Sequence, residues 1–346
     1  MVPAKPTNAD EVLDLLDAAF PAAALGAALE LGLFWLLETR PLDGKEVARR
    51  LGIPAGRCRY WLQLLCSTGL INEGDDGLSP SSTARSAILD TQSRDSWKLL
   101  AREARERLPG LSHLPLSLRE PDSAWEAIGL KPRMYVDQMC EDAERARRFT
   151  RMLYELHQPL ADELTERLDL GGVEGLLDLG GGSGVVSLAL LRRYPRLRAT
   201  VVDIANVCAA GREIAAEHSL GDRIVYHASD FLRDELPSGF DLALECDVNV
   251  YSVPLFRRIR DSLNTDGRFV IVDQLAPAAG VAPAARLHWA FEGSLRDPFF
   301  QFPTAEMIGD QLREAGFRDL AESDLPSTPS SCSRFSGGMV LIEAHA

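Results

Sequence analysis

The 346-residue chain has little lysine and an excess of acids. Only four of its 37 basic residues are lysine, and 51 acidic residues give a formal net charge of −14. A broad nucleic-acid surface needs clustered positive charge, so the composition argues against one. We therefore expect a small-molecule ligand and predict no nucleic-acid partner.

Cysteine spacing and long apolar runs are also missing. The six cysteines form no C-x-x-C or similar pattern, which argues against the common metal and redox motifs. The longest apolar stretch, 20–37, is interrupted by Pro21, Gly26, Glu30 and Gly32, so it does not resemble a signal peptide or a membrane span. We expect a cytoplasmic protein with no membrane partner and no metal.

What the chain does have is a glycine turn between a strand and a helix. Residues 175–179 read as a buried strand, Gly180-Gly181-Gly182-Ser183-Gly184 follow, and a helix is predicted from Val185 to Arg193. Glycines permit positive φ and let backbone N–H groups lie against a ligand. The acid Asp178 precedes the glycines.

Two further acids follow the next two predicted strands. Asp203 ends the strand 199–203, where a carboxylate can accept hydrogen bonds from both hydroxyls of a ribose. Asp230 and Phe231 follow the strand 224–227, where a carboxylate and a ring could bind the amino group and the face of an adenine. The order of these features predicts an adenosine-containing ligand.

With these motifs in order, the chain resembles the class I S-adenosylmethionine-dependent methyltransferases, specifically the plant- and actinobacterial-type small-molecule O-methyltransferases. The resemblance covers nearly the whole chain and includes the turn Asp266-Gly267-Arg268 and the later Ala315-Gly316-Phe317. It implies an α/β enzyme with a Rossmann-like seven-stranded catalytic domain and S-adenosylmethionine as cofactor. The residues expected to bind the cofactor are Asp178, Gly180, Gly182, Asp203, Asp230, Phe231 and Glu245.

Residues 1–110 have a winged-helix pattern. Two helices divided near Pro21 are predicted over 9–40, then two short helices around a turn, and a hairpin at 72–78. A DNA-binding domain would need a basic recognition helix, which is missing here. The resemblance implies instead a dimerisation domain that joins two copies of the chain and helps to close the partner's substrate pocket.

Residues 111–171 are expected to form a helical bridge, and 172–346 the catalytic domain. One long helix is predicted over 135–168, bent or split at Pro159. Strands of the catalytic domain are predicted near 176, 200, 225, 241, 269 and 338, and the serine-rich stretch 327–336 is predicted to be a loop.

The main departure from the family concerns its catalytic base. Members of the family carry a histidine after the fourth strand of the catalytic domain. Counting from Asp241 places Val250 at that position, or Asn249 or Tyr251 if the register slips by one residue. No histidine lies between His227 and His288. A general base is needed mainly when the nucleophile is a phenol, because alignment alone supplies much of the rate of methyl transfer.

Three explanations of this departure are open. The acceptor atom could be a carbon or nitrogen that needs no prior deprotonation, another side chain could act as base, or the fold could bind the sulfonium without transferring its methyl group, as a cyclase or hydroxylase. The predicted catalytic residues are Glu245, Asp247 and His288. The predicted substrate-binding residues are Phe149, Met152, His157, Tyr251, Trp289 and Glu292, of which Phe149, Met152 and His157 could equally be core residues.

The sequence thus predicts a methyltransferase that acts on a small aromatic or amino-acid-derived metabolite. Methylation of carbon or nitrogen is favoured and oxygen is the close second. The arginine-rich, lysine-poor composition is typical of a GC-rich bacterial genome, which favours a place in specialised metabolism. A metal site of Asp247, His288 and Glu292 is the weaker alternative, because their spacing does not support it.

Overall fold

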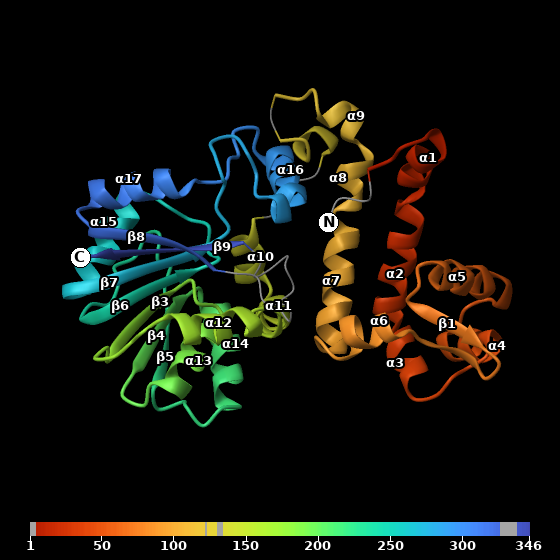
Figure 1. Cartoon of the computed structure of the whole chain (residues 1–346), viewed down its shortest axis with the longest axis horizontal. Coiled ribbons are helices and arrows are strands. Elements are labelled where there is room, and N and C mark those ends of the chain that lie inside the picture. The colour runs from red at the N-terminus through yellow and green to blue at the C-terminus, as the bar shows by residue number, and fades with distance from the viewer. Residues whose placement is uncertain (1–4, 122, 130–133, 326–337) are drawn as a thin grey trace. The chain divides into compact units, whose positions relative to one another are not determined.

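The computed structural model describes residues 5–121, 123–129, 134–325 and 338–346. The chain divides into two compact units, one ending at Ser112 and one beginning at His113. The predicted serine-rich loop at 327–336 lies outside the described residues. Figure 1 identifies the helices and strands of each unit.

The first unit is mostly helical with a small hairpin. The predicted order of two short helices and a hairpin is present, and the hairpin pairs Ile71 with Pro80. Its elements are α1 (Ala9–Asp17), α2 (Ala19–Leu31), α3 (Leu33–Glu38), α4 (Gly44–Leu51), α5 (Ala55–Ser67), β1 (Ile71–Gly74), β2 (Gly77–Pro80), α6 (Ser82–Ala84), the π-helical η1 (Arg85–Leu89), α7 (Arg94–Glu106) and α8 (Leu108–Ser112).

The division of the first helices differs from the prediction. The break falls at Ala18, and Pro21 lies in the first turn of α2, where backbone N–H groups have no intrahelical partner and proline is tolerated. A second break occurs at Gly32, whose left-handed backbone (φ 78°) ends α2. By length and composition alone the stretch Ala9–Leu31 could cross a membrane, a test that core helices of soluble proteins and signal sequences also pass.

The second unit alternates strands and helices after a helical start. Its elements are α9 (Leu114–Ser117), η2 (Glu126–Ile128), α10 (Tyr135–Glu141), α11 (Ala143–Leu156), α12 (Gln158–Arg167), β3 (Gly175–Leu179), α13 (Val185–Arg193), β4 (Arg198–Asp203), α14 (Ala205–Ala216), β5 (Ile224–Ala228), β6 (Phe240–Cys246), α15 (Val253–Ser262), β7 (Leu263–Asp273), η3 (Ala284–Arg286), α16 (Leu287–Arg296), α17 (Ala305–Ala315), β8 (Arg318–Leu325) and β9 (Met339–His345).

The long helix predicted over 135–168 is three helices. The predicted split near Pro159 is confirmed, because α11 ends before His157 and Pro159 lies in the first turn of α12. The break at Asp142 was not predicted. The Asp142 carboxylate accepts a hydrogen bond from the backbone N–H of Arg145 (2.9 Å) and thereby caps the start of α11.

The predicted seven-stranded sheet is confirmed, in the order β5-β4-β3-β6-β7-β9-β8. The first five strands of this order are parallel, and β9 runs antiparallel to both of its neighbours. Strand β8 was missing from the predicted strand positions because most of its residues are polar and exposed. The parallel strands place their carboxyl ends, and the loops that follow, at one edge of the sheet.

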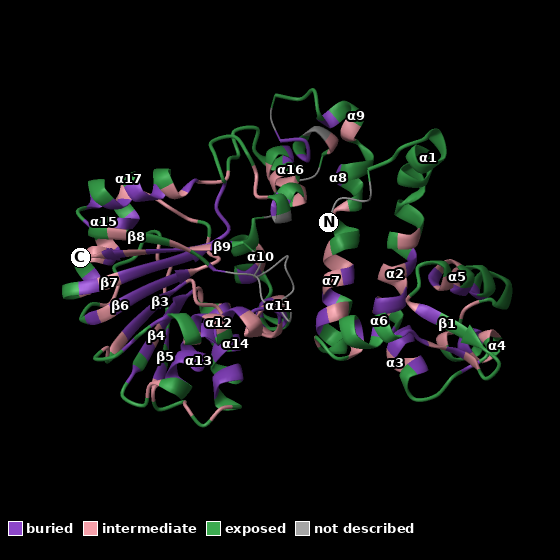
Figure 2. Ribbon diagram, in the orientation of Figure 1, coloured by how far each residue is buried: buried purple, intermediate pink, exposed green. Residues whose placement is uncertain are grey.

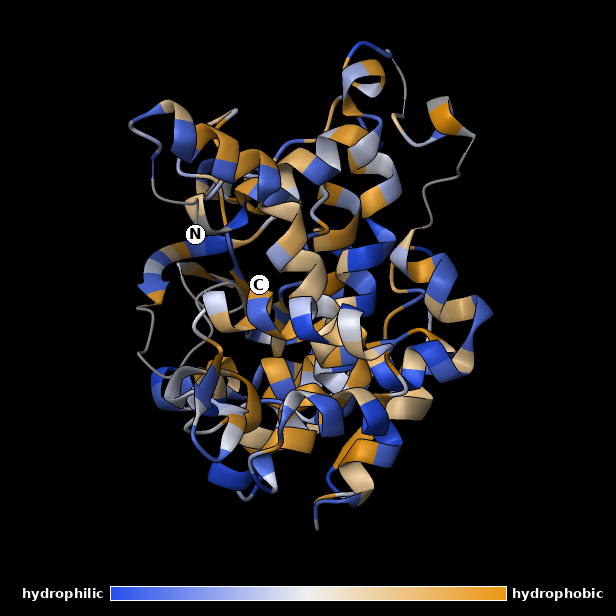
Figure 3. Ribbon diagram, turned by 90° about the vertical axis from the view of Figure 1, so that its right-hand side faces the viewer, coloured by the Kyte–Doolittle hydropathy of each residue, from blue (hydrophilic) through white to orange (hydrophobic). Residues whose placement is uncertain are grey.

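Buried residues cover both faces of the central strands (Figure 2). One face packs against α12, α13 and α14 through Leu164, Leu188 and Ile214, and the other against α15 and α17 through Phe256 and Leu312. Side chains alternate between these faces along each strand. Figure 3 shows hydrophobic and hydrophilic residues alternating along the helices, as in amphipathic helices with one buried side.

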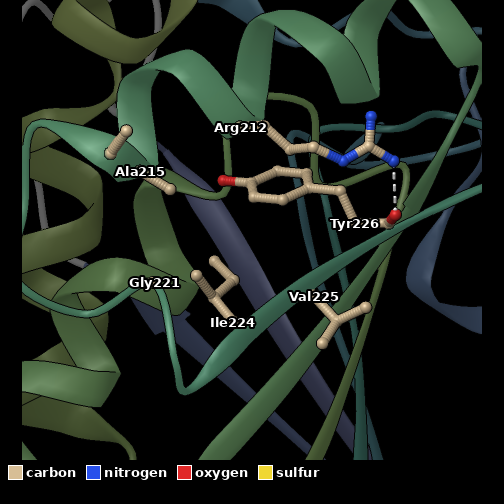
Figure 4. Close-up of a pocket in the computed structure, with 7 residues that line it drawn as sticks. Arg212, Ala215, Gly221, Ile224, Val225 and Tyr226 are labelled. Carbon is tan, nitrogen blue, oxygen red and sulfur yellow. Dashed lines mark hydrogen bonds between the residues drawn. The ribbon is translucent and has the colours of Figure 1, made fainter.

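Tyr226 on β5 holds the glycine turn in place through a hydrogen bond and through the packing of its ring. Its hydroxyl donates a hydrogen bond to the backbone oxygen of Ser183 (2.7 Å). Its ring occupies the space beside Gly211 of α14, where a Cβ atom would lie 2.3 Å from the ring and 2.9 Å from the backbone oxygen of Gly182. Figure 4 shows Tyr226 beside Arg212, which donates to the Tyr226 backbone oxygen (2.7 Å).

We expect Gly211→Ala to destabilise the protein. Alanine normally stabilises a helix interior by about 1 kcal/mol relative to glycine, but overpacking against Tyr226 costs about 1–3 kcal/mol. Thermal unfolding followed by circular dichroism measures the difference. Gly56→Ala in α5 is the control, since a Cβ there meets open space and should not destabilise. A melting temperature of Gly211→Ala at or above that of wild type would contradict the packing argument.

Candidate active site

The glycine turn follows β3 at the carboxyl edge of the sheet. Gly180, Gly182 and Gly184 have positive φ of 63°, 56° and 74°, a conformation that side chains with Cβ rarely adopt. A Cβ at Gly180 would lie 2.8 Å from Val248, and one at Gly181 would lie 2.4 Å from the carboxyl carbon of Asp178. The turn therefore requires glycine both for its backbone and for its close neighbours.

Asp203 lies at the end of β4, next to this turn. Its Oδ2 accepts the Gly182 N–H (3.0 Å) and its Oδ1 accepts the Ile204 N–H (2.7 Å). Burial raises the pKa of Asp203 to about 6, although both backbone hydrogen bonds oppose this shift. Each oxygen keeps a lone pair for a further donor, as a ribose diol would require.

Asp178 lies beneath the turn and is more deeply buried. It accepts a hydrogen bond from the Ser187 hydroxyl (2.6 Å) at the start of α13. Burial, opposed by the Ser187 hydrogen bond and assisted by the charge of Asp203, raises its pKa to about 7. These contacts favour a role in holding the turn against α13.

Asp230 and Phe231 follow β5 and are partly exposed. One carboxylate oxygen of Asp230 accepts the Leu232 N–H (3.0 Å), and the Phe231 ring lies 3.5 Å from the position that a Gly180 Cβ would take. The Phe231 ring therefore lies beside the glycine turn, and Asp230 directly precedes it in the same loop, as an adenine site at this edge would require.

Asp247, directly after β6, is the centre of a second cluster. Its Oδ2 lies 3.2 Å from His157 Nε2, and its Oδ1 accepts from Arg286 (3.0 Å) and from the Asn249 side chain (3.3 Å). Asp247 and Asn249 both have a left-handed backbone, with φ of 54° and 62°. Burial alone would raise the pKa of Asp247, but His157 and Arg286 hold it below its usual range.

His157 is held at both ring nitrogens. Nδ1 lies 2.9 Å from the backbone oxygen of Leu153, and Nε2 contacts Asp247. Burial lowers the pKa of His157, but the bond to Asp247 outweighs it and the net shift is upward. Two acceptors suit an imidazolium, which donates from both nitrogens. The pairing favours a positioning role for His157 and Asp247 over that of a free base.

Asp273 ends β7 and binds the loop that carries Val250. Its Oδ2 accepts from the Tyr251 hydroxyl and from the Asn249 N–H (3.2 Å), and its Oδ1 accepts from the Gln274 N–H (2.7 Å). Burial, and then the charge of Asp247, raise the pKa of Asp273 to about 7. Burial also raises the pKa of Tyr251 well above its usual value, so its hydroxyl stays a donor.

Glu245, at the end of β6, differs from all these acids. It is 2% exposed, and neither carboxylate oxygen has a hydrogen-bond partner among the described residues. Burial and then the charge of Asp273 raise its pKa well above the usual value, and the Val250 backbone N–H opposes this shift.

The remaining predicted residues lie on α11 and α16. Phe149 packs against the Tyr135 ring (centroids 5.5 Å apart) and belongs to a cluster with Ile204 and Val207, whereas Met152 is 3% exposed. Trp289 lies under the Arg286 guanidinium, 5.4 Å from its ring centre. The Glu292 carboxylate already pairs with Arg296 (2.5 Å). The roles assigned to Glu292 and His288 stay predictions.

Three residues of this site were not predicted. Arg286 and Gln274 bond to each other and reach Asp247 through Arg286. The Tyr135 hydroxyl lies near Asp203, and burial followed by that charge raises its pKa. Only tertiary contacts reveal Arg286, Gln274 and Tyr135, although Asp273 could have been found as one more acid at a strand end.

Two other features do not form a site. Across the described ranges, no group of three or more His, Cys, Asp or Glu side chains is arranged to hold a metal ion. The pocket of Figure 4 is lined by α14 and β5 residues and contains none of the predicted site residues.

Comparisons with known proteins agree with this geometry. A model of the O-methyltransferase domain matches residues 119–296. The chain belongs to this family. The solved structure of PigF with S-adenosylhomocysteine superimposes with a TM-score of 0.82 at 20% identity, over 98% of this chain and all of that one. The chain is thus an S-adenosylmethionine-dependent small-molecule methyltransferase.

Its curated relatives differ in the atom that their names specify. An N,N-dimethyltransferase, OxyT of Streptomyces rimosus, is 28% identical over 90% of this chain and 91% of its own. A 3-hydroxy-5-methyl-1-naphthoate 3-O-methyltransferase of Streptomyces sahachiroi is 33% identical over 67% and 66%. An L-tyrosine C(3)-methyltransferase of Streptomyces lavendulae is 28% identical over 75% and 73%.

The raised pKa values of the buried acids predict a stability that falls as pH rises. Asp178, Asp203 and Asp273, with pKa values of about 7, 6 and 7, hold protons that the unfolded chain has already lost above about pH 4. Their contribution is full below that pH and is lost through about pH 6–7. Each extra bound proton lowers the free energy of unfolding by up to about 1.4 kcal/mol per pH unit.

Urea unfolding at a series of pH values between about 5 and 8 measures this slope. Asp178→Asn should flatten it, because asparagine does not titrate, and Asp222→Asn on the surface should leave it unchanged. A stability that rises with pH over this range in wild type would contradict the assignment.

Proposed function

We propose that this methyltransferase acts on a small aromatic or amino-acid-derived metabolite of specialised metabolism, such as antibiotic biosynthesis, and methylates carbon or nitrogen in preference to oxygen. The observation that carries the proposal is Val250, between Asn249 and Tyr251 in the loop after β6. Both neighbours of Val250 bond to Asp273, so the loop is anchored there without a base at its centre.

Asp247, His157 and Tyr251 do not supply a substitute base. Asp247 has three partners and a lowered pKa, and His157 uses both ring nitrogens. Tyr251 donates to Asp273 and is a poor base at neutral pH. A phenol, which loses its proton near pH 10, would therefore enter this site with little help toward ionisation.

The names of the relatives include each of the three candidate atoms. OxyT is named as acting on nitrogen and the L-tyrosine enzyme on carbon, and both cover about three quarters or more of this chain. The naphthoate enzyme, named as acting on oxygen, supports oxygen as the second candidate with a substitute base. A cyclase or hydroxylase that keeps the methyl group is the third.

We assign the cofactor site to the carboxyl edge of β3, β4 and β5. The glycine turn would face the cofactor with its backbone, Asp203 would accept from the ribose hydroxyls, and Asp230 with Phe231 would bind the adenine. Glycines that admit no Cβ and an acid with free lone pairs fit such a ligand. The bound cofactor supplies an electrophilic methyl group on a sulfonium sulfur.

The residues around the acceptor would align it rather than ionise it. We assign its pocket to Met152 and Phe149 of α11, Tyr251, and His288, Trp289 and Glu292 of α16. His157 and Arg286 would hold Asp247, and through it the loop after β6, in one position. Alignment alone can contribute about 7–11 kcal/mol to such a displacement.

We also propose a cytoplasmic homodimer joined through the first unit. Helix α1 has no buried residue, and Leu16 and Phe20 are 75% and 67% exposed. An apolar surface of this kind is typical of an interface. The acidic chain and the few basic residues of α5 argue against the alternative of a winged-helix DNA-binding regulator.

Transfer from methyl-labelled cofactor tests the acceptor atom. We expect incubation with labelled S-adenosylmethionine and an extract of candidate metabolites to place the label on carbon or nitrogen, located by NMR. Label on a phenolic oxygen would refute the preference. A converted product without label would instead indicate the cyclase or hydroxylase alternative.

Light scattering tests the dimer. Wild type should have twice the 37.9 kDa mass of one chain at micromolar concentration. Leu16→Ser with Phe20→Ser should reduce it to a monomer, whereas Leu232→Ser, an exposed leucine of the second unit, should not. A monomeric wild type would rule out the proposed interface.

A further inference from the structure

Glu245 is a buried acid whose position the packing of the fold does not explain. Among the described residues, it is the one buried carboxylate in which neither oxygen has a hydrogen-bond partner. A carboxyl in such a position loses its hydration in either protonation state, and here the Val250 backbone N–H compensates that loss only in part. Buried polar groups without partners are uncommon, and they often mark a place where a ligand binds.

The position of Glu245 places it beside Asp273. Glu245 pairs with Ile271 of the neighbouring strand β7, and Asp273 lies two residues beyond Ile271. Side chains two residues apart on a strand point to the same face, so Glu245 and Asp273 are diagonal neighbours. Both lie on the face that packs against α15, and both are about 2% exposed or less.

No hydrogen bond from a cation reaches this pair of acids among the described residues. The charge of Arg286 lowers the pKa of Asp273, but its guanidinium bonds to Asp247 and to Gln274. Asp273 accepts from three neutral donors, in Tyr251, Asn249 and Gln274. A ligand that pairs with the two acids must offer hydrogen-bond donors, and a positive charge on it would stabilise their ionised forms.

We propose that Glu245, beside Asp273 and Tyr251, binds the ammonium group of an amine acceptor and takes its proton, so that this chain is an N-methyltransferase. The inference rests on the proposed function and narrows it to one atom. An ammonium satisfies both requirements of the acid pair. A phenolate or enolate oxygen is an acceptor with negative charge, and the pair would repel it.

The valine at position 250 also favours an amine as the acceptor. Valine is smaller than histidine and cannot bond to Asp273, and the loop carries no positive group between Asn249 and Tyr251. The two acids are therefore left to a ligand. An amine also needs no strong base, because a carboxylate in a buried pair can take the proton that an ammonium loses.

Methyl transfer to the amine begins with the loss of a proton. The acceptor ammonium gives one proton to the Glu245 carboxylate and becomes a neutral amine. The nitrogen lone pair then forms the bond to the methyl carbon, and the carbon–sulfur bond breaks with its electron pair on sulfur. The product nitrogen carries the positive charge, and the proton on Glu245 passes to solvent.

Binding of simple amines to the full-length protein tests the proposal. The probes are benzylamine, phenethylamine and tyramine, each with its matched alcohol, titrated by calorimetry into protein saturated with S-adenosylhomocysteine. We expect at least one amine to bind about tenfold more tightly than its alcohol, and Glu245→Gln to abolish that difference. Asp241→Asn, at the opposite end of β6, should keep it.

The other outcomes are decisive as well. No preference for any amine, or a preference that survives in Glu245→Gln, would overturn the proposal. If Glu245→Gln weakened S-adenosylhomocysteine but not 5′-methylthioadenosine, which lacks the amino-acid part, the carboxyl would serve the cofactor ammonium and the acceptor assignment would be wrong. Failure of wild type to bind S-adenosylhomocysteine would count against the proposed function itself. Thermal unfolding shows whether each variant is folded.

Discussion

The ion pairs of Asp247 determine the arrangement of the acceptor side of the site. One carboxylate connects the end of β6 to the junction of α11 and α12 through His157, and to the start of α16 through Arg286. All three groups are at most about 15% exposed. Removing one partner from a buried pair leaves an uncompensated charge, so the three elements depend on one another. The loop after β6 takes its left-handed turns at Asp247 and Asn249 within this network.

The cofactor side could be predicted from sequence because its signals are local. The glycine turn, Asp203 and Asp230 each follow a strand within a few residues, and parallel strands bring such positions to one edge. Tyr226 on β5 supports the glycine turn of this side through its bond to Ser183. The acceptor side was harder to predict from the sequence, because His157 and Arg286 lie 90 and 39 residues from Asp247 along the chain. No periodicity marks such pairs. Strand β8 was missed for another reason, since it is an edge strand whose polar residues lack the alternation of a half-buried strand.

The buried acids of this domain differ in whether other groups pair with them. Asp203 and Asp178 bond to the glycine turn and to Ser187, and Asp247 has two cationic partners. Glu245 has none. A fold that satisfies most of its buried carboxylates and leaves one unsatisfied concentrates its electrostatic cost at a single place. That place adjoins the backbone of Val250 in the loop after β6.

The anchoring of the loop on both sides of Val250 bears on how this family changes its chemistry over evolution. Asn249 and Tyr251 fix the backbone through Asp273, so the side chain between them can be exchanged without rebuilding the loop. A single codon change at such a position can add or remove an imidazole while the cofactor edge stays intact. Enzymes that transfer the same methyl group to different elements can thus diverge from a common ancestor in few steps.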